Sequence, residues 1–254
     1  MKRFSRYTIR GRVLSSSLAC VMLGMMLTAC GIGASSDNPA ESGTMDQSAR
    51  IKAVDIPSLK AQNPDIFGWV FIPDTMIDTP ILQNGQGEDE YYETHDCTGA
   101  ENESGAVYIK SANLSDMCDF NEILYFPYSK GDIISSEVVD FLDESYFESH
   151  PMMYIYIDGN ALTYEVYAAY ESSNIDVLRN YDFTTIEGCE EYIRDMETDL
   201  LSGGLIRTGW EEGVDPYNYL VTLSTVNPKD SSKRVNVVGC LIGDASGTIY
   251  RSFD

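Results

Sequence analysis

The sequence is poor in positive charge, with 17 lysines and arginines against 40 acidic residues. Five of the basic residues precede Val13 in a stretch that contains no acid, so the rest of the chain carries a formal charge of −28. Such a surface repels nucleic acid and anionic lipid. The chain also lacks a basic stripe with interleaved aromatic residues, the usual footprint of nucleic-acid binding. We therefore expect no nucleic-acid partner.

Metal-ligating residues are equally scarce. The chain has only two histidines, His95 and His150, and six cysteines that form no Cys-x-x-Cys pair, which argues against a structural zinc site. The densest run of acids extends from Glu88 to Asp96, but its spacing is not that of an EF-hand loop, and a solvated loop is the preferred interpretation. The sequence predicts no metal and no cofactor.

The N-terminus has the composition of an export signal. A basic stretch is followed by an apolar run of 17 residues from Val13 to Ala29, which is short for a membrane-spanning helix. The run ends in Leu27-Thr28-Ala29-Cys30, which resembles a bacterial lipobox and implies lipidation of Cys30. The alternative is an uncleaved signal anchor with an ordinary cysteine. Both place the body of the protein outside the cell, anchored to the outer face of the cell membrane.

The domain organisation follows from these segments. We expect a lipoprotein-type signal peptide at residues 1–29 and a folded domain at 49–254. Residues 30–48 are rich in Gly, Ser, Ala, Asn and Asp, a composition typical of a flexible tether. The length of the folded part is suited to one β domain.

Short runs rich in Val, Ile, Tyr and Thr dominate the folded part and favour β-strands. Eight of them predict a mainly β fold closed into a barrel. The predicted strands are Gly68–Pro73, Ile77–Gln83, Gly105–Lys110, Glu122–Tyr128, Met152–Asp158, Leu162–Tyr170, Tyr219–Val226 and Arg234–Ile242.

Three helical segments interrupt the strands. The first is Gln47–Gln62, with Pro57 as a break between two short helices, and the second is Ser135–Phe147. The third, Thr184–Leu201, is the clearest because Thr184 and Glu187 have the spacing of a capping box. The prediction thus places a long helix between the sixth and seventh strands.

Two segments carry chemically informative motifs. Tyr219–Val226 reads Tyr-Leu-Val-Thr-Leu-Ser-Thr-Val, and Arg234 follows eight residues later. This run resembles the Leu-Ser-Thr-Cys strand end of class B sortases, Gram-positive enzymes that cut a sorting signal and join the protein to the cell wall. Val226 stands at the position of the catalytic cysteine, and Arg234 stands at that of the essential arginine.

The second motif lies upstream. Residues 121–128 resemble the family segment Asn-Thr-x-x-Tyr-Gly-His, which carries the catalytic histidine. Pro127 stands at the histidine position and Phe126 at the glycine position. The resemblance runs from about Ser58 to Ile242 and implies a sortase-type β-barrel of eight strands, with N-terminal helices and the long helix of class B members.

The resemblance implies a site that has lost its chemistry. In the family a thiolate attacks the scissile carbonyl, a histidine protonates the leaving amine, and an arginine holds the substrate and the oxyanion. Val226 has no nucleophilic atom, and Pro127 has no titratable group. Ser224 shares a strand face with Val226 but lies about 6–7 Å away, too far to replace it. The resemblance therefore implies a pseudoenzyme with a retained Arg234.

The expected ligand is a sorting-signal peptide or a cell-surface protein, held in a groove. Candidate groove residues are Ser224, Thr225, Tyr125 and Trp210. Two other hypotheses stay open. An active transpeptidase would use a displaced nucleophile, Cys240 or Cys118, with one of the two histidines. A surface scaffold would use another face of the molecule.

One disulfide is expected in the folded part. Cys97 and Cys118 flank a single predicted strand in loop-like surroundings, and an exterior location permits disulfides. Cys240 lies in an apolar run, where a small buried side chain is the preferred interpretation.

Overall fold

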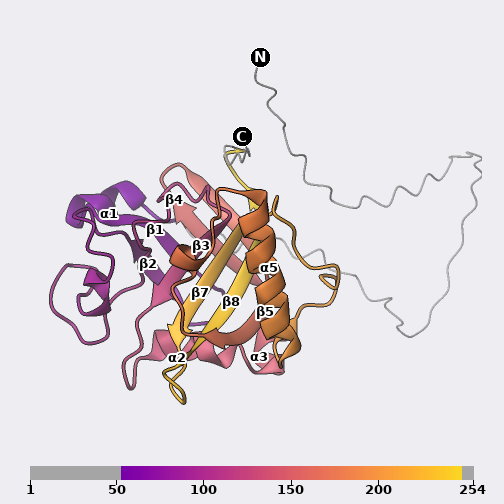
Figure 1. Cartoon of the computed structure of the whole chain (residues 1–254). Helices are drawn as coiled ribbons and strands as arrows, with labels where there is room; N and C mark the ends of the chain where they lie inside the picture. Colours follow the sequence, from indigo (N-terminus) through magenta and orange to yellow (C-terminus); the bar gives the residue numbers. More distant parts are fainter. Residues whose placement is uncertain (1–52, 248–254) are drawn as a thin grey trace, which may run out of the picture. The chain divides into compact units, whose positions relative to one another are not determined.

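The computed structural model describes residues 53–247 (Figure 1). The predicted signal peptide, Cys30 and the tether lie outside the described residues. Within residues 53–247, no helix is both long enough and apolar enough to cross a membrane.

The described chain is built around one eight-stranded sheet, which confirms the mainly β prediction. Its hydrogen-bonded order is β2-β1-β4-β5-β8-β7-β3, with β6 added to β5. All pairs are antiparallel except β3 and β7, which are parallel. The strands are β1 Ile66–Phe71, β2 Asp78–Leu82, β3 Asn121–Phe126, β4 Met152–Ile157, β5 Asn160–Ser173, β6 Leu205–Ile206, β7 Leu220–Val226 and β8 Lys233–Asp244.

The segment around Tyr108 joins the two ends of this sheet. Leu82 of β2 donates its N–H to Val107 O at 3.0 Å, and Tyr108 and Tyr125 of β3 exchange backbone hydrogen bonds at 2.8 and 3.2 Å. The predicted strand Gly105–Lys110 is therefore wrong as a regular strand, because only isolated bridges form at Tyr108. Gly105, at φ 63°, turns the chain immediately before these bridges. The eighth strand is the short β6 instead.

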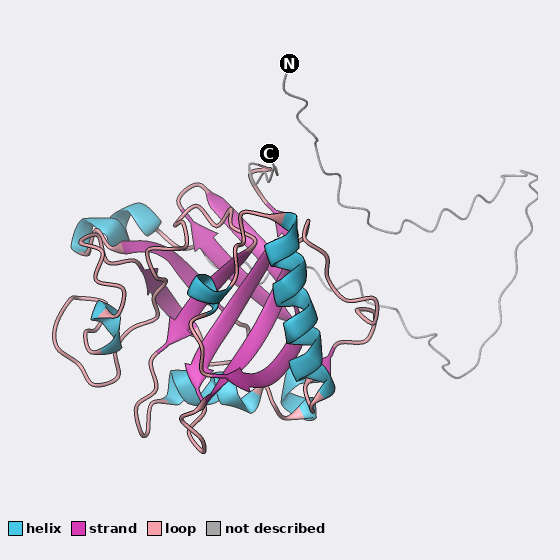
Figure 2. Cartoon of the chain, viewed as in Figure 1, coloured by secondary structure: helices cyan, strands magenta, loops and turns pink. Residues whose placement is uncertain are grey.

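The helices lie on the outside of the barrel, as Figure 2 shows. The longest covers one face of β5, β7 and β8, where Tyr192, Met196 and Leu200 pack against the sheet. A second cluster, which includes Val70, Ile155, Val221 and Val237, forms the barrel core. The helices are α1 Ile56–Gln62, η2 Tyr91–Glu93, α2 Ile133–Asp140, α3 Glu144–Ser149, α4 Val177–Asn180 and α5 Ile186–Leu201.

Three helix predictions need correction at their boundaries. Pro57 lies in the first turn of α1, where its missing N–H costs nothing, and breaks no helix among the described residues. The segment Ser135–Phe147 is two helices, because Asp143 caps Tyr146 N and starts α3 after the turn at Phe141.

The third correction concerns the start of α5. Its N-cap is Thr185, whose Oγ1 accepts from Gly188 N at 3.1 Å. Thr184 instead donates its hydroxyl to Asp182 Oδ1 at 2.6 Å, in the turn before the helix. The predicted capping box of Thr184 and Glu187 is therefore wrong by one residue, because Thr184 is already used by this preceding turn.

A buried arginine that carries no sequence signal ties three elements together. A bulge in β5 between Val166 and Ala168 interrupts the ladder to β8. Arg207, 6% exposed, donates Nε to Val166 O at 2.6 Å and Nη2 to Phe147 O at 2.6 Å. Its Nη1 lies 3.2 Å from Glu148. Arg207 thus supplies donors to buried carbonyls at the bulge and at α3.

Replacing Arg207 by alanine should destabilise the domain strongly. The change removes the arginine donor to the buried Val166 carbonyl and one of the two donors to the Phe147 carbonyl, which keeps His150 N, so we expect a loss of about 2–3 kcal/mol in the free energy of unfolding. Urea unfolding followed by circular dichroism measures it. Arg194→Ala, at an exposed position of α5, is the control and should change stability by less than about 0.5 kcal/mol. Equal effects of the two changes would contradict the assigned role.

One carboxyl group is buried without full hydrogen bonding. Glu122 of β3 is 1% exposed, and its Oε1 accepts from Asp119 N at 3.3 Å. Its Oε2 has no hydrogen-bond partner among the described residues. Burial, and next the negative charge of Asp119, raise the pKa of Glu122 well above its ordinary value. The folded protein therefore holds a proton there that the unfolded chain releases.

Glu122→Gln should change how stability depends on pH. A raised pKa in the folded state gives full stability below the unfolded pKa of about 4.3, and this contribution is lost as the pH rises toward the folded pKa. Between pH 5 and 7 the variant should gain stability over the wild type by up to about 1.4 kcal/mol per pH unit. Urea unfolding at several pH values tests this, with the exposed Glu190→Gln as control. Parallel curves for wild type and variant would refute it.

Candidate functional site

The three positions matched to the sortase catalytic residues meet at one end of the sheet. In the β7–β8 ladder Val226 lies directly opposite Arg234. In the β3–β7 ladder Phe126 pairs with Thr225, so Pro127 follows at the level of Val226. Helix α2 packs at this end of β7 and β8. The register of β3, β7 and β8 thus brings the two motifs, which are far apart in the chain, together at one site.

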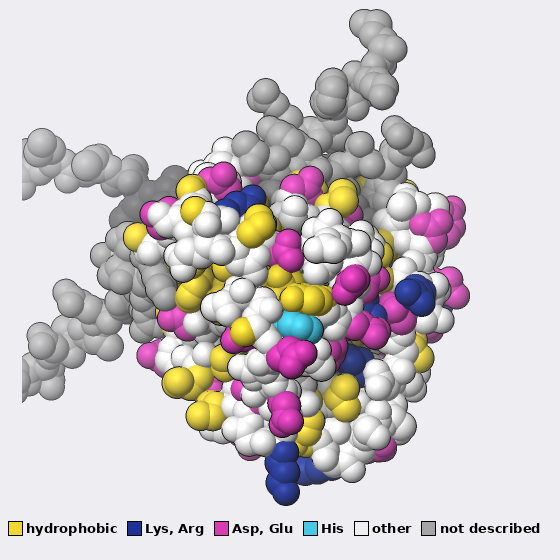
Figure 3. Space-filling view, turned by 90° about the vertical axis from the view of Figure 1, so that its left-hand side faces the viewer, with side chains coloured by type: hydrophobic (Ala, Val, Ile, Leu, Met, Phe, Trp, Pro, Cys, Tyr) yellow, Lys and Arg dark blue, Asp and Glu magenta, His cyan; other side chains and the backbone are white. Residues whose placement is uncertain are grey.

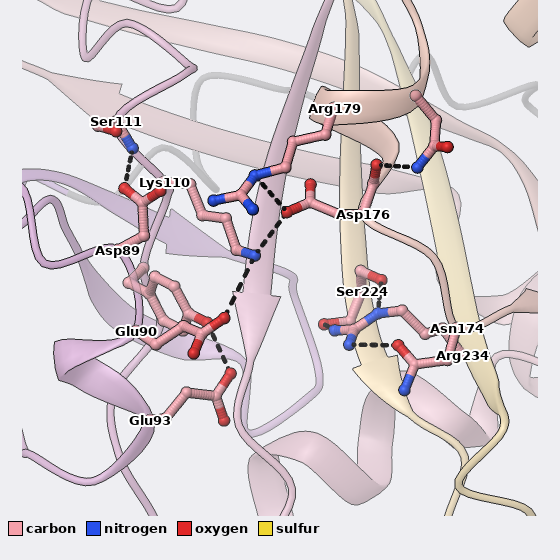
Figure 4. Close-up of polar contacts among 12 residues, drawn as sticks. Asp89, Glu90, Glu93, Lys110, Ser111, Asn174, Asp176, Arg179, Ser224 and Arg234 are labelled. Carbon is pink, nitrogen blue, oxygen red and sulfur yellow. Dashed lines mark hydrogen bonds and ion pairs between the residues drawn. The ribbon is translucent and has the colours of Figure 1, made fainter.

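Arg234 is held in place by neutral polar groups. Its Nε donates to Ser224 Oγ at 2.7 Å, its Nη2 donates to Ser224 O at 3.1 Å, and its Nη1 lies 3.4 Å from Asn174 Oδ1 (Figure 4). No carboxylate of residues 53–247 lies within 4.0 Å of this guanidinium. Among the described residues, Arg234 is therefore a half-buried cation without an ion-pair partner.

The aromatic neighbours of Arg234 complete its surroundings. The guanidinium carbon lies 5.2 Å from the centre of the Tyr125 ring, and Lys110 Nζ lies 4.9 Å from the same centre. Tyr108 stacks on Tyr125 at 5.3 Å and donates its hydroxyl to Glu93 Oε1 at 2.6 Å. Burial lowers the pKa of Arg234, although an arginine remains charged at neutral pH. Two cations therefore share one tyrosine ring.

A charged network adjoins this pair of cations. Lys110 Nζ lies 3.1 Å from Asp176 and 3.7 Å from Glu90, and Arg179 lies 3.4 Å from Asp176 (Figure 4). Next to it is an open cavity of about 660 Å³ lined by Glu88, Asp89, Glu90, Tyr91, His95 and Arg179, among others. Acidic side chains and few basic ones are visible on the face shown in Figure 3. Lys110 thus has acidic neighbours on both sides, Glu90 and Asp176.

The structure brings together only part of the predicted groove. Ser224 and Tyr125 both contact Arg234, as their positions on one sheet face predict. Thr225 is fully buried on the other face of β7. Trp210 packs against Tyr167 at 5.6 Å, within the cluster under α5. The structure thus places Trp210 in this cluster and not among the residues that contact Arg234.

Ser224 is not available as a replacement nucleophile in this geometry. It is 2% exposed, and its hydroxyl donates to Asn236 Oδ1 at 2.7 Å while accepting from Arg234. Asn236 in turn donates to Ser172 Oγ at 2.8 Å. The hydroxyl of Ser224 therefore donates to an amide oxygen, and no base of residues 53–247 is in contact with it.

The residues of the displaced-nucleophile hypothesis do not assemble at this end of the sheet either. Cys118 precedes β3, whose first residue pairs with Leu220, and so lies at the other end of the strand from Pro127. Cys240 is 1% exposed, and burial raises the pKa of its thiol to about 12. It pairs with Leu220, at the opposite end of β7 from Arg234. The ring Nδ1 atoms of His95 and His150 contact the carbonyls of Tyr91 and Tyr146 at 2.8 and 2.7 Å. Each histidine is thus engaged by its own loop or helix.

The predicted disulfide is not present. Cys97 and Cys118 are both thiols in this structure. Cys118 precedes β3, whereas Cys97 lines a cavity of about 120 Å³ together with Pro127, which follows β3. The length of a six-residue strand, about 20 Å, separates these two ends. A disulfide requires a Cα separation below about 7 Å, so the prediction was wrong for a geometric reason.

Several residues of the site carry no signal in the sequence. Asn174 contacts Arg234, Lys110 lies over the Tyr125 ring, and Asp176 pairs with Lys110, from two loops that are about 60 residues apart in the chain. Only a barrel topology brings these loops together. No group of three or more histidine, cysteine or acidic residues suited to a metal ion occurs within residues 53–247.

Comparison with known proteins places this geometry in a class. The structure is similar to that of Clostridium perfringens sortase B, with a TM-score of 0.64 at 23% identity, over 74% of this chain and 99% of the other. It is also similar to sortase B in the Staphylococcus aureus sortase B–substrate complex, with a TM-score of 0.61 at 24% identity, over 74% and 84% of the two chains. The fold is that of a sortase.

The sequence agrees with the fold. Listeria monocytogenes sortase B is 24% identical over 190 residues, which cover 74% of each chain. No protein-family model matches the chain. By sequence and structure together, the chain is a homologue of the class B sortases.

Proposed function

We propose that this sortase homologue is a lipid-anchored, extracytoplasmic protein that binds a sorting-signal-like peptide or a cell-surface partner at Arg234 without cleaving it. The observation that carries the proposal is the register of β7 and β8, in which Val226 lies opposite Arg234. The residue closest in register to the retained cation has no nucleophilic atom. The anchor and the location rest on the sequence around Cys30.

The state of Arg234 supports a binding role. A half-buried arginine that serves as an ion-pair partner would contact a carboxylate, but Arg234 contacts a serine, an asparagine and a tyrosine ring instead. The positive charge of Arg234 is therefore not neutralised by an ion pair among the described residues and can attract a polar group of a ligand. A peptide carbonyl or carboxylate fits this requirement, because interactions with a cation are strengthened in partly dry surroundings.

The same geometry disfavours cleavage by a displaced residue. Covalent catalysis needs a nucleophile and a base within hydrogen-bond reach of each other. Ser224 donates to an amide, the thiol of Cys240 has a raised pKa, and both histidines contact backbone carbonyls. Among residues 53–247, no nucleophile and base that the transpeptidase alternative requires lie in contact at this site.

Binding is tested with Arg234→Ala. We expect the affinity for a pool of fluorescently labelled sorting-signal peptides to fall at least tenfold, because the variant removes the cation that faces the ligand. Fluorescence anisotropy measures the affinity. Lys233→Ala is the matched control, since Lys233 is the adjacent basic residue of β8 and pairs with Glu171. Equal affinity of both variants would favour a scaffold that uses another face.

Loss of chemistry is tested by restoring the two missing groups. Val226→Cys combined with Pro127→His should give weak peptide cleavage and an acyl adduct on the new cysteine, detected by intact-protein mass spectrometry. Phe126 is left unchanged because its side chain packs in the barrel core. The wild-type protein should show neither cleavage nor adduct. Turnover by the wild type would overturn the assignment as a pseudoenzyme.

A further inference from the structure

The segment that follows β5 crosses the side of the sheet that carries Tyr125. We name residues Ile175–Asn180, which include α4, the strap. Val177 and Leu178 of the strap pack against the cluster that contains Tyr108, Ile123 and Tyr125. Asp176 of the strap pairs with Lys110, whose ammonium group lies over the Tyr125 ring. The strap therefore packs beside Tyr125, whose ring also lies 5.2 Å from the Arg234 guanidinium carbon.

Both ends of the strap are fixed. At one end, Asn174 donates its backbone N–H to Ser232 O at 2.8 Å and its Nδ2 to Ser231 O at 3.1 Å. At the other end, the Tyr181 hydroxyl donates to Asp195 Oδ2 of α5 at 2.7 Å, and the Tyr181 ring packs edge-on against Tyr192. These anchors restrict any movement to the residues between them.

The middle of the strap is weakly held. Helix α4 has only four residues, none of them buried, and its N-cap residue Asp176 makes no side-chain capping hydrogen bond. Ile175 is 42% exposed, and the Arg179 side chain is 78% exposed. Segments with few buried apolar contacts open at a lower free-energy cost than the core strands. The strap is thus a candidate for local opening while the barrel stays folded.

The closed strap also contains an unsatisfied polar atom. Asp176 Oδ2 is shared between Lys110 at 3.1 Å and Arg179 at 3.4 Å. Its Oδ1 is buried and has no hydrogen-bond partner among the described residues. A buried carboxylate oxygen without a partner costs free energy that opening would recover. The Lys110–Asp176 pair is therefore the principal polar contact that keeps the strap closed. The free energy that this pair contributes is partly offset by the cost of burying Asp176 Oδ1 without a partner.

We propose that the strap is an autoinhibitory cover, which must open before a ligand reaches the buried Tyr125 ring beside Arg234. The inference rests on the proposed binding function and adds its regulation. Opening releases the Lys110 ammonium group from Asp176 and exposes the tyrosine ring between the two cations. If a ligand binds only the open form, its apparent Kd equals its Kd for the open form divided by the fraction of molecules that are open. Weakening the closed form therefore tightens binding without any new contact.

Two variants weaken the strap by different means. Asp176→Asn removes the charge that pairs with Lys110, and Leu178→Ala removes an apolar contact with the cluster of Tyr108 and Tyr125. The matched controls are Asp158→Asn, in the exposed turn between β4 and β5, and Leu201→Ala, at an 88% exposed position. Neither control position lies in the strap or in the site.

The experiment uses the full chain in detergent, with the labelled sorting-signal peptides as the probe. Both strap variants should bind the peptides about three- to tenfold more tightly than wild type, the change expected for loss of a half-buried ion pair or contact. Amide hydrogen exchange at residues 175–181 should accelerate in both variants, while exchange in β7 and β8 stays unchanged. The two controls should match wild type in both readouts.

The outcomes separate the inference from the function on which it rests. Peptide binding with equal affinity in wild type and strap variants would overturn the cover and leave the binding function standing. Faster exchange without tighter binding would do the same. No binding by wild type or by any variant would overturn the proposed function, and the cover would fall with it. Binding by the strap variants alone would support both.

Discussion

The site depends on the position of β7, which is hydrogen-bonded along its length to β3 on one side and to β8 on the other. This double pairing puts Tyr125, Ser224 and Asn236 in one row across three strands. Val221 and Leu223, both fully buried, hold the opposite face of β7 in the barrel core. A slip of one residue would turn these apolar side chains to the outside, so the core fixes the register on which the site relies.

The positive charge of Arg234 can hold a ligand even where no reactive group is present. In a partly dry site, a fixed positive charge attracts a carbonyl or an oxyanion more strongly than in water. That interaction is useful for holding a ligand even when no bond is broken. In the function proposed above, Val226 and Pro127 stand in place of a thiol and an imidazole, and Arg234, opposite Val226 in the ladder, supplies the binding part of the site. The homology to class B sortases and the missing reactive groups are therefore compatible.

The loops around the site are joined to one another by charged groups. Lys110 connects the acidic loop, through Glu90, with the segment after β5, through Asp176. These contacts lie outside the barrel core and are more exposed than the strands they cover. Loops held by a rigid scaffold are the usual place for recognition and for its variation among relatives. Basic residues are scarce in this acidic chain, so the presence of both Lys110 and Arg234 at one tyrosine ring distinguishes this part of the surface.

Local patterning was enough to predict much of the fold. The β-rich runs predicted seven of the eight strands, and the segment Thr184–Leu201 predicted the long helix with its start two residues too early. The predictions failed where tertiary contacts compete with local signals. Thr184 has the capping-box spacing, but Asp182 takes its hydroxyl, and Gly105–Lys110 has strand composition, but its neighbours allow only isolated bridges. Arg207 shows no pattern at all, because its partners arise from a bulge and a helix end.

The sequence by itself determined the residue types at the three positions that the resemblance matches to the sortase catalytic residues: valine, proline and arginine. It also determined that Ser224 and Val226 share a strand face, since side chains alternate along a strand. Only the tertiary structure decided which groups surround Arg234. Asn174, Lys110 and Asp176 come from loops far apart in the chain, and barrel closure brings them together. The same closure separates Cys97 from Cys118 and keeps Trp210 under α5, because distance in a barrel depends on strand order and not on sequence spacing.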